Sequence, residues 1–566
     1  MGDLKKDAYL RAKEKAERFL SEEGEYRLGY IEAEKPHPKT RRLSQTFLEN
    51  VSAGVRLLAE VDSEMSLRAK EALASEEYAL FADSVRKTLG RGHRVIFSGC
   101  GSSGRLSMQL ERSFRAAAEK LIAAYPDIKD AVTDLRDRVG VIMTGGDYAV
   151  IRAAESFEDS TKLGREMARE KGIGEGDLLI GVTATGETTS VIGTAEQALD
   201  NGARVYMLIC SPPDEMINRL SRVRKVYGHK NCSVLVMPSG PMALTGSTRM
   251  QSSTIEQLAG GVALEGAVYD LLEKHGKVAV FPGYAAYGRA FEDTASSLLN
   301  ERAVRLMTRL IENERDVYKN GGVVTLFSDD CILDVLTDTT ERSPTFKTPP
   351  FRPEGDKTGE TSWAFFKHTF LDTPSAWRKC FLRELNCIEW DREKYRSLGL
   401  SDEQIDAIPD IGAKALLSFR IGCERDEERE GEGNLAEWVG VFSPDESFYK
   451  ASRGYGIRVS LSLEEAGVEC MPTYMDIFEH LGLKMALNDV STGAMACMGR
   501  IDGNWMTSLS LSNKKLTDRG ARIVSDLCSV PYEKALFEVL YSLELIKEKS
   551  GSDSPVHETI VRLGMK

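Results

Sequence analysis

The sequence has no run of apolar residues long enough to cross a membrane. A membrane-spanning helix needs about 18 or more consecutive, mostly apolar residues, and no window of the chain approaches this length. The opening stretch, MGDLKKDAYLRAKEKAERFL, is charged and helical in period, without the apolar segment of a secretory signal peptide. We therefore expect a cytoplasmic protein with no membrane partner.

Cysteine and histidine are present without the spacing of a disulfide framework or a metal site. The ten cysteines include no CxxC pair, and the seven histidines are scattered. Such cysteines are typical of buried or free thiols in a reducing compartment. The sequence therefore predicts no metal site and no cofactor.

An excess of basic residues is also missing, because the formal net charge is -13. Nucleic acids and anionic membranes call for a surplus of Lys and Arg on one face, so neither is expected as a partner. A small anion remains compatible with this charge, since backbone N–H groups and one or two basic side chains can hold a phosphate.

The length and composition favour a globular protein of more than one domain. A chain of 566 residues exceeds what one hydrophobic core usually supports. The fractions of hydrophobic residues (42%) and charged residues (28%) are ordinary for globular proteins.

Short apolar runs alternate with helical stretches in the first half of the chain. The runs are RVIFSG at 94–99, GVIMTGG at 140–146, LLIGVTA at 178–184, RVYMLIC at 204–210 and CSVLVMP at 232–238. Strands that are buried on both faces have this nearly continuous apolar character. The pattern predicts an α/β fold with a doubly wound parallel sheet.

The second half starts the same alternation again, with GGVVTLFS at 321–328, EWVGVFS at 437–443 and IRVSLSL at 457–463. The acidic run ERDEEREGEGN at 424–434 predicts a solvated loop. We expect four parts: a helical N-terminal segment (1–90), a first α/β domain (91–285), a second one (286–484) and a helical C-terminal segment (485–566).

A glycine- and serine-rich loop at 99–104 follows the first apolar run, and a helical stretch is expected from Arg105. Glycines let the backbone approach a ligand, N–H groups at a helix start point toward it, and hydroxyls add donors. A plain turn would explain the glycines but not the paired serines. We predict that Gly101, Ser102 and Ser103 bind a phosphate.

The same loop also satisfies the GxGxxG pattern of dinucleotide sites. Such a site requires an acidic residue about 20 positions further on, at the end of the next strand. Here the next apolar run ends at Gly146, far beyond that spacing. The dinucleotide interpretation is therefore not favoured.

Two more hydroxyl-rich loops stand at predicted helix starts, one at 183–190 and one at 246–250. Loops at the carboxyl ends of neighbouring parallel strands converge on one crevice, and a guanidinium suits phosphate or carboxylate. From these loops we predict further binding residues: Thr183, Thr185, Gly186, Thr188, Ser247 and Arg249.

Several motifs in one order resemble a known family. The strings GCGSSGRL, GGDYAV, ESFEDS, GVTATGETT and GSTRMQSST are similar to those of the bacterial N-acetylmuramic acid 6-phosphate etherases and the related glucokinase regulatory protein. Near the C-terminus, ALNDVSTGAMACMG and SLSNKKLTDRGARIV resemble the family's closing motifs. This resemblance implies flavodoxin-like sugar isomerase (SIS) domains.

The two halves resemble different parts of the family's site, as in the tandem form of the regulatory protein. DTTERSPTF at 338–346 is similar to the family's acidic motif, whereas the first half has Ser113 at the matching place, with Glu111 two residues away. The second half has FSDDCILD where a phosphate loop would stand. We therefore predict one composite site, with a phosphate cradle from the first domain and Glu341 from the second.

The resemblance also implies roles for particular residues. Glu158 of ESFEDS and Glu341 match the two carboxylates of the etherase site, and Lys515 of SNKKL matches a lysine that contacts the sugar phosphate. Etherase chemistry removes the lactyl group by elimination and adds water, which two carboxylates can serve as base and acid. Which carboxylate takes which role stays open.

Three functions remain in competition, and each requires a phosphorylated sugar as partner. The motifs favour a carbon–oxygen lyase of etherase type. A non-catalytic regulator of a sugar kinase is the alternative, although only about 50 residues follow Lys515, where the regulatory protein has a longer helical cap. A phosphosugar isomerase is the third.

Overall fold

A computed structural model describes residues 2–152, 157–356, 360–426, 429–511, 513–549 and 554–564. Three stretches singled out in the sequence lie partly outside these ranges: Glu155 and Ser156 of ESFEDS, Glu427 and Glu428 of the acidic run, and Ser512 of SNKKL. None of the described helices has the length and apolar character needed to cross a membrane.

The first sheet has five parallel strands in the order β2-β1-β3-β4-β5, which is the flavodoxin-like order. Its strands are β1 (Val95–Gly99), β2 (Val139–Met143), β3 (Leu178–Val182), β4 (Arg204–Ile209) and β5 (Cys232–Val236). Every residue of β1, β2 and β3 is buried, as their apolar runs predict. Around them lie α5 (Gly101–Ala124), α6 (Lys129–Asp137), α7 (Thr161–Glu170), α8 (Thr189–Asp200), α9 (Asp214–Arg219) and α10 (Ser221–Tyr227).

The second sheet has four parallel strands in the order β7-β6-β8-β9, which repeats the first four positions of the first sheet. They are β6 (Val324–Phe327), β7 (Ala364–Lys367), β8 (Gly431–Gly440) and β9 (Tyr455–Ser462). The helices of this half are α14 (Ile332–Phe346), α15 (Thr373–Phe381), α16 (Arg392–Ser397), α17 (Asp402–Asp406), α18 (Ala413–Leu417), α19 (Glu446–Ala451) and α20 (Leu463–Ala466). The fold is therefore α/β with two tandem parallel sheets, as predicted.

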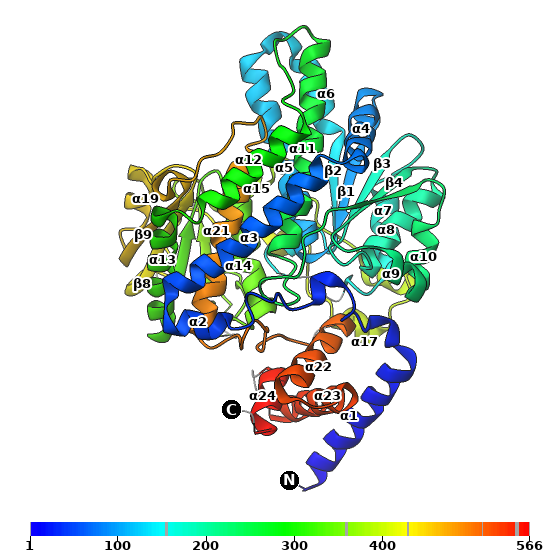
Figure 1. The fold of residues 1–566 in the computed structure, drawn as a ribbon, viewed down its shortest axis with the longest axis vertical. Coiled ribbons are helices and arrows are strands. Elements are labelled where there is room, and N and C mark those ends of the chain that lie inside the picture. Colours follow the sequence, from blue (N-terminus) through cyan, green and yellow to red (C-terminus); the bar gives the residue numbers. More distant parts are fainter. Residues whose placement is uncertain are drawn as a thin grey trace.

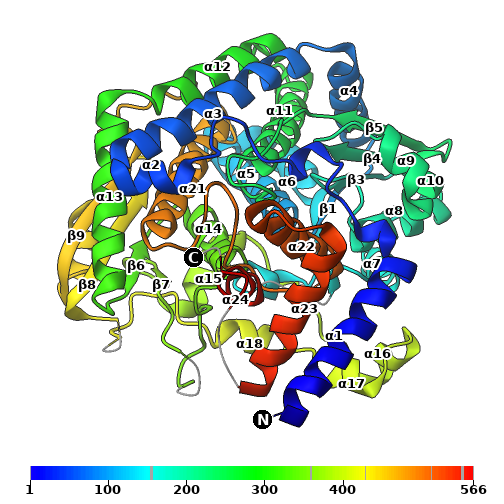
Figure 2. The same cartoon turned by 60° about the horizontal axis from the view of Figure 1, so that its bottom comes forward.

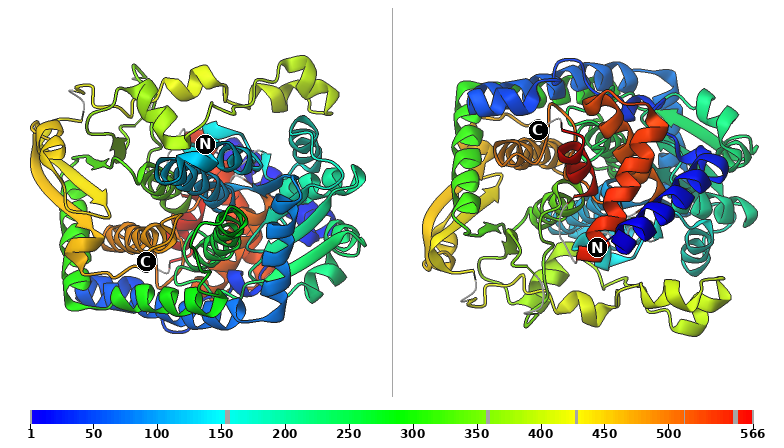
Figure 3. Two further views of the ribbon diagram at one scale, coloured as in Figure 1. Left: turned by 90° about the horizontal axis from the view of Figure 1, so that it is seen from above. Right: turned by 90° about the horizontal axis from the view of Figure 1, so that it is seen from below.

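Seven helices, all but α2 longer than ten residues, lie between and beside the two sheets (Figure 1). They are α2 (Leu43–Glu49), α3 (Val51–Leu73), α4 (Glu76–Gly90), α11 (Gln251–Lys274), α12 (Tyr284–Ser297), α13 (Glu301–Lys319) and α21 (Ile477–Cys497). Helix α21 contacts α11 from the first half and α14 from the second. Seen from above and below, the two sheets lie on opposite sides of this helical layer (Figure 3).

The helices of the two ends of the chain form a separate layer. It consists of α1 (Gly2–Glu22), α22 (Lys514–Cys528), α23 (Tyr532–Lys549) and α24 (Pro555–Arg562). Helix α23 contacts α1, α22 and α24 (Figure 2). The N-terminal helix is therefore held by the C-terminal segment, although more than 500 residues separate them.

One hydrophobic core joins the two halves. Val95 and Phe97 of β1 belong to the same buried cluster as Val324 and Leu326 of β6. Ile96 points to the other face of the first sheet, where a second cluster lies. Because side chains alternate along a strand, the continuous apolar run supplies both clusters.

Local differences from the sequence prediction have physical reasons. Helix α5 begins at Gly101 and not at Arg105, because the chain turns directly from the end of β1 into a helix. Strand β8 begins at Gly431, so the last four residues of the predicted acidic loop (431–434) belong to a strand. Gly431 pairs with Tyr455 of β9, and the register is irregular from there to Leu435. Strand β7 was not predicted, since AFFK is too short to show a period.

A buried ionic network fixes α14 against α13 and the loop before α11. Arg342 donates to Asp338 (2.9 Å) and to both carboxylate oxygens of Glu314 (2.9 and 3.2 Å). Arg249 donates to the other oxygen of Asp338 at 2.9 Å. Burial alone would raise the pKa of Asp338, but Arg342 and Arg249 hold it below its usual value.

Replacing Arg342 with methionine is expected to lower the free energy of unfolding by about 3–5 kcal/mol, because the buried Glu314 loses its guanidinium partner and the buried Asp338 keeps only Arg249. Urea unfolding would measure the loss. Arg289→Met, an exposed arginine on α12, is the control and should change stability by less than about 0.5 kcal/mol. An equal effect of both variants would show that the network contributes nothing.

Candidate functional site

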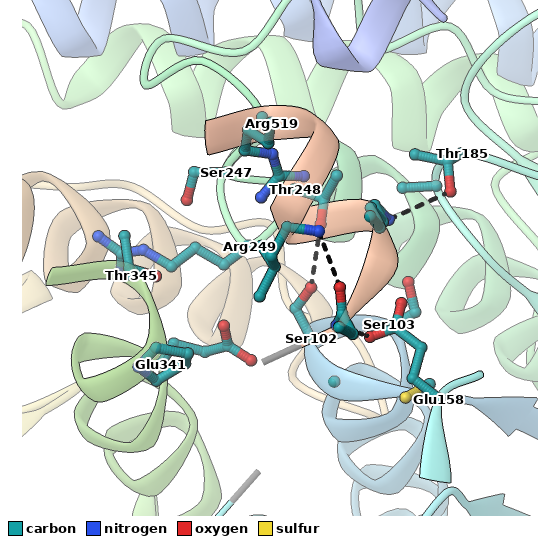
Figure 4. Close-up of a pocket in the computed structure, with 18 of the residues that line it drawn as sticks. Ser102, Ser103, Glu158, Thr185, Ser247, Thr248, Arg249, Glu341, Thr345 and Arg519 are labelled. Atoms are coloured by element: carbon teal, nitrogen blue, oxygen red, sulfur yellow. Dashed lines mark hydrogen bonds between the residues drawn. The ribbon is translucent and has the colours of Figure 1, made fainter. Parts of the chain in front are cut away.

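A polar pocket of about 130 Å³ lies at the carboxyl edge of the first sheet, where α14 and α22 approach it (Figure 4). Its wall therefore comes from the first half, the second half and the C-terminal segment. The lining residues are Cys100, Gly101, Ser102, Ser103, Glu158, Ala184, Thr185, Thr188, Gly246, Ser247, Thr248, Arg249, Glu341, Pro344, Thr345, Met506, Leu509, Asn513, Lys515, Leu516 and Arg519.

The first turn of α5 forms the floor of the pocket. Gly101 has a φ of +54°, which suits glycine at the sharp entry into the helix. Ser102 lies 3.4 Å from the Thr248 hydroxyl, and Ser103 donates to Glu256 at 3.1 Å. Backbone N–H groups of a first helical turn lack helical partners, so this turn can hold an anion.

The carboxyl group behind this turn does not oppose an anion. Burial raises the pKa of Glu256 to about 8, while its hydrogen bond from Ser103 acts in the opposite direction. At neutral pH this carboxyl is therefore mostly protonated, and no fixed negative charge stands under Ser103.

The loop after β3 supplies a second wall. Thr185 and Thr188 line the pocket, whereas Thr183 and Gly186 are not among its described lining residues. Thr183 lies 2.9 Å from the Thr188 hydroxyl, and Gly186 has a φ of +78°, so both shape the loop. The loop thus brings two of its four predicted binding residues to the pocket.

The third loop brings Ser247 and Arg249 to the pocket, but the guanidinium of Arg249 is largely engaged by the second half. In addition to Asp338, it donates to Ser491 at 3.1 Å and to Thr492 at 2.7 Å. Arg249 therefore ties the loop to α14 and α21 as well as lining the pocket.

Glu341 reaches the pocket from α14 of the second half. Its carboxylate pairs with the guanidinium of Arg105, which is fully buried and also donates to the Ala149 carbonyl at 3.0 and 2.7 Å. Arg105 belongs to the first half, so this ion pair joins the two halves beside the cradle. Glu111, near the place where the first half lacks its glutamate, instead pairs with Arg383 at 2.8 Å.

Glu158 lies across the pocket from Glu341, with Ser102 and Ser103 between them (Figure 4). Burial raises the pKa of Glu158 to about 7, although Lys515 opposes this shift. The neighbouring carboxylates of Asp159 and Glu187 add to it. A carboxyl group with this pKa can both release and accept a proton at neutral pH.

Helix α22 covers the pocket with two basic side chains. The ammonium of Lys515 lies 3.5 Å from the Thr185 hydroxyl and 3.9 Å from Glu187. Arg519, one turn later, donates to the buried Glu34 at 3.1 and 2.5 Å. The pocket therefore has positive charge opposite the first turn of α5.

Sequence reasoning missed several lining residues for which a signal existed. Arg519 follows Lys515 by four positions, and Thr345 follows Glu341 by four, so each pair shares a helix face. Asn513 directly precedes helix α22, which is a common place for a capping residue. Met506 and Leu509 gave no such signal.

The corresponding edge of the second sheet is filled by its own side chains. After β6, Asp329 accepts hydrogen bonds from the Thr369 N–H (3.2 Å) and hydroxyl (2.7 Å) and lies 3.3 Å from His368. A carboxylate thus takes the donors at the end of β7 that an anion would use. This fits the absence of a glycine-rich loop in FSDDCILD.

One buried group in the described part of the chain has donor atoms close enough for a metal ion: Cys331, Asp334 and His480, all within 4.8 Å of one another. His480 Nδ1 and Asp334 are 2.8 Å apart and form a hydrogen bond. A closed tetrahedral zinc site needs a fourth ligand, and these residues do not line the pocket.

Comparisons with known proteins identify similar sequences. Residues 78–199 match the family described as the glucokinase regulatory protein N-terminal SIS domain. The N-acetylmuramic acid 6-phosphate etherase of Synechococcus sp. (strain CC9902) is 29% identical over 51% of this chain and 78% of its own length. That of Clostridium botulinum (strain Okra / Type B1) is 30% identical over 41% and 66%.

Solved structures that match this chain have low sequence identity and TM-scores below 0.5. The C-terminal domain of glucosamine-fructose-6-phosphate aminotransferase from Francisella tularensis has a TM-score of 0.42 and 9% identity, covering 80% of this chain and 97% of that one. Tagatose-6-phosphate ketose/aldose isomerase from Escherichia coli has a TM-score of 0.41 and 9% identity, covering 79% and 95%.

Proposed function

We propose that this chain, which belongs to the family of the N-acetylmuramic acid 6-phosphate etherases and the glucokinase regulatory protein, binds a phosphorylated sugar in the composite pocket and acts on it as a carbon–oxygen lyase. The substrate is N-acetylmuramic acid 6-phosphate or a related 6-phosphosugar. The observation that carries the proposal is the meeting of Glu158 and Glu341 from the two halves beside one anion cradle.

Binding of the phosphate would use Ser102, Ser103 and the first N–H groups of α5, with Lys515 supplying positive charge from above. The threonines of the loop after β3 would add donors. The sugar would then lie between Glu158 and Glu341.

The chemistry would need two proton transfers. One carboxylate removes the proton at C2 of the sugar, the C3–O bond to the lactyl group breaks, and the other carboxyl group protonates the departing oxygen. Addition of water to the new double bond, with the proton returned to C2, completes the reaction. The protons balance over the whole cycle: the base takes the C2 proton and later returns it to C2, while the acid gives a proton to the departing oxygen and regains one from the water that adds.

The pH profile of kcat/KM is expected to bend at about pH 7, where Glu158 titrates. If Glu158 is the base, activity falls below this pH, because the base becomes protonated. If it is the acid, activity falls above it. Glu158→Gln should remove this bend along with most of the activity; a bend that persists in the residual activity of the variant would assign it to another group.

The function is tested by incubating the protein with N-acetylmuramic acid 6-phosphate and assaying released lactate. We expect lactate to appear in proportion to the protein. Absence of lactate, together with thermal stabilisation by fructose 6-phosphate, would refute the lyase and leave phosphosugar binding in place.

A regulator of a sugar kinase is the second candidate. It is favoured by the match of residues 78–199 to the regulatory protein's N-terminal SIS domain and by the ion pair that engages Glu341 with Arg105. For this function we expect a complex with a hexokinase-type protein of the same organism whose stability depends on sugar phosphate. A complex whose stability does not change with sugar phosphate would contradict the regulatory function.

A further inference from the structure

We propose that Asn513 is a positioning residue, which holds the carboxylate of Glu158 toward the pocket and favours its ionised form. This inference rests on the proposed role of Glu158 in the pocket. Asn513 also lines the pocket itself, directly before helix α22.

The two ends of the Asn513 amide make two different contacts. Its oxygen accepts a hydrogen bond from the Leu516 N–H at 2.8 Å, which caps α22. Its nitrogen donates to a carboxylate oxygen of Glu158 at 3.2 Å. One side chain thus fixes both the start of the helix that carries Lys515 and the orientation of Glu158.

The amide cannot be reversed without losing both contacts. The helix cap requires an acceptor, because the N–H groups of the first turn are donors. The opposite end must then be the NH₂ group, and it faces a carboxylate, which is an acceptor when ionised. The capping contact therefore dictates that Glu158 receives a donor.

The backbone around Glu158 is held independently of this contact. The Glu158 carbonyl accepts a hydrogen bond from the Ser190 N–H at 2.9 Å, at the start of α8. The side chain is therefore the part of Glu158 that Asn513 constrains. Loss of the amide nitrogen should free the carboxylate without displacing the chain.

Donation from Asn513 opposes the effects that disfavour charge on Glu158. Burial and the nearby carboxylates raise its pKa to about 7. A hydrogen bond to the ionised form acts in the other direction. Without this donor, a smaller fraction of Glu158 would be ionised at neutral pH, and the group would titrate at higher pH.

Two substitutions separate this role from capping. Asn513→Ser keeps a good N-cap but removes the donor to Glu158, and Asn513→Asp keeps the cap but places a second carboxylate against Glu158. Asn50→Ser is the matched control, because Asn50 caps α3 by accepting from the Ala53 N–H and has no carboxylate partner in the described structure.

The first measurement is the affinity for inorganic sulfate as a function of pH. Sulfate keeps its charge near neutral pH, so a change in affinity reports on the protein. We expect the wild-type affinity to fall as Glu158 ionises, with a midpoint near pH 7. This step should be absent in Glu158→Gln, which keeps only the later fall that ionisation of Glu256 near pH 8 produces. Asn513→Ser should move the midpoint up by about one pH unit, and Asn513→Asp further.

The second measurement is the pH profile of lactate release. The bend assigned to Glu158 should move upward by the same amount in Asn513→Ser, while the thermal midpoint of unfolding stays close to that of Asn50→Ser. If the pH midpoint of sulfate binding and the bend of the lactate profile in Asn513→Ser both equal those of the wild type, Asn513 is only a helix cap and the inference is wrong.

The sulfate titration separates the inference from the proposed function. If no variant and no wild-type protein releases lactate, the lyase proposal fails, but the sulfate midpoints still decide whether Asn513 acts on Glu158. A shifted midpoint would then support Asn513 as a positioning residue of a binding pocket.

Discussion

Replacing Glu341 with glutamine is expected to lower kcat for lactate release about 10³-fold, in the range that loss of a general acid or base produces. The amide keeps the shape of the side chain and can still accept a hydrogen bond from Arg105, but it can neither give nor take the proton of the reaction. The phosphate cradle belongs to the other half of the chain, so affinity for phosphosugar should change by less than about threefold.

Glu544→Gln is the matched control for this substitution. Glu544 is a buried glutamate that pairs with Lys15 at 2.6 Å and Arg11 at 2.9 Å, far from the pocket in α23. The Glu544→Gln variant shows what the loss of a buried ion pair alone does to activity. Unchanged turnover in Glu341→Gln would remove Glu341 from the mechanism, and a loss of activity in both variants would indicate a loss of stability.

Replacing Gly99 with alanine is expected to weaken phosphosugar binding about 100-fold, equivalent to about 2.7 kcal/mol. A Cβ atom at this position would meet the backbone of Ser103 and Gly104 at 2.6 Å, and backbone cannot rotate out of the way. The first turn of α5 would have to move off the end of β1. Its N–H groups and both serines would then no longer converge on the phosphate.

The control for this variant is Gly90→Ala at the end of α4. An added Cβ there has no neighbour within 4 Å, so binding should stay unchanged. Titration calorimetry with fructose 6-phosphate would compare the two. If Gly99→Ala binds as tightly as the wild type, the phosphate does not sit on the first turn of α5.

The strands of the first sheet could be predicted because each contains an almost continuous apolar run, although only β1, β2 and β3 are buried throughout, whereas β4 begins with an exposed residue and β5 is mostly half-buried. The runs at 178–184, 204–210 and 232–238 end one or two residues beyond the observed strands β3, β4 and β5. The run at 140–146 ends three residues beyond β2, because it includes the turn at 144–146. Strand β7 escaped prediction because four residues that end in Lys367 carry no period. The start of α5 was placed too late, since glycine and serine are weak helix formers and the turn at Gly101 overrides their propensity.

The pairing of charges could not be predicted from the sequence. The sequence predicts Arg249 as a binding residue, and its side chain lines the pocket, but its partner Asp338 lies 89 positions further on. Arg105 and Glu341 are 236 positions apart, and only the packing of α14 against α5 brings them together. Sequence patterns show which residues share an element, whereas contacts between elements depend on the whole fold.

The composite pocket is tested most directly by a crystal structure of the protein with a bound hexose 6-phosphate. We predict the phosphate at Ser102 and Ser103, with Lys515 above it and the sugar ring between Glu158 of the first half and Glu341 of the second. A sugar phosphate bound away from Glu341, or at the edge of the second sheet beside Asp329, would contradict the account.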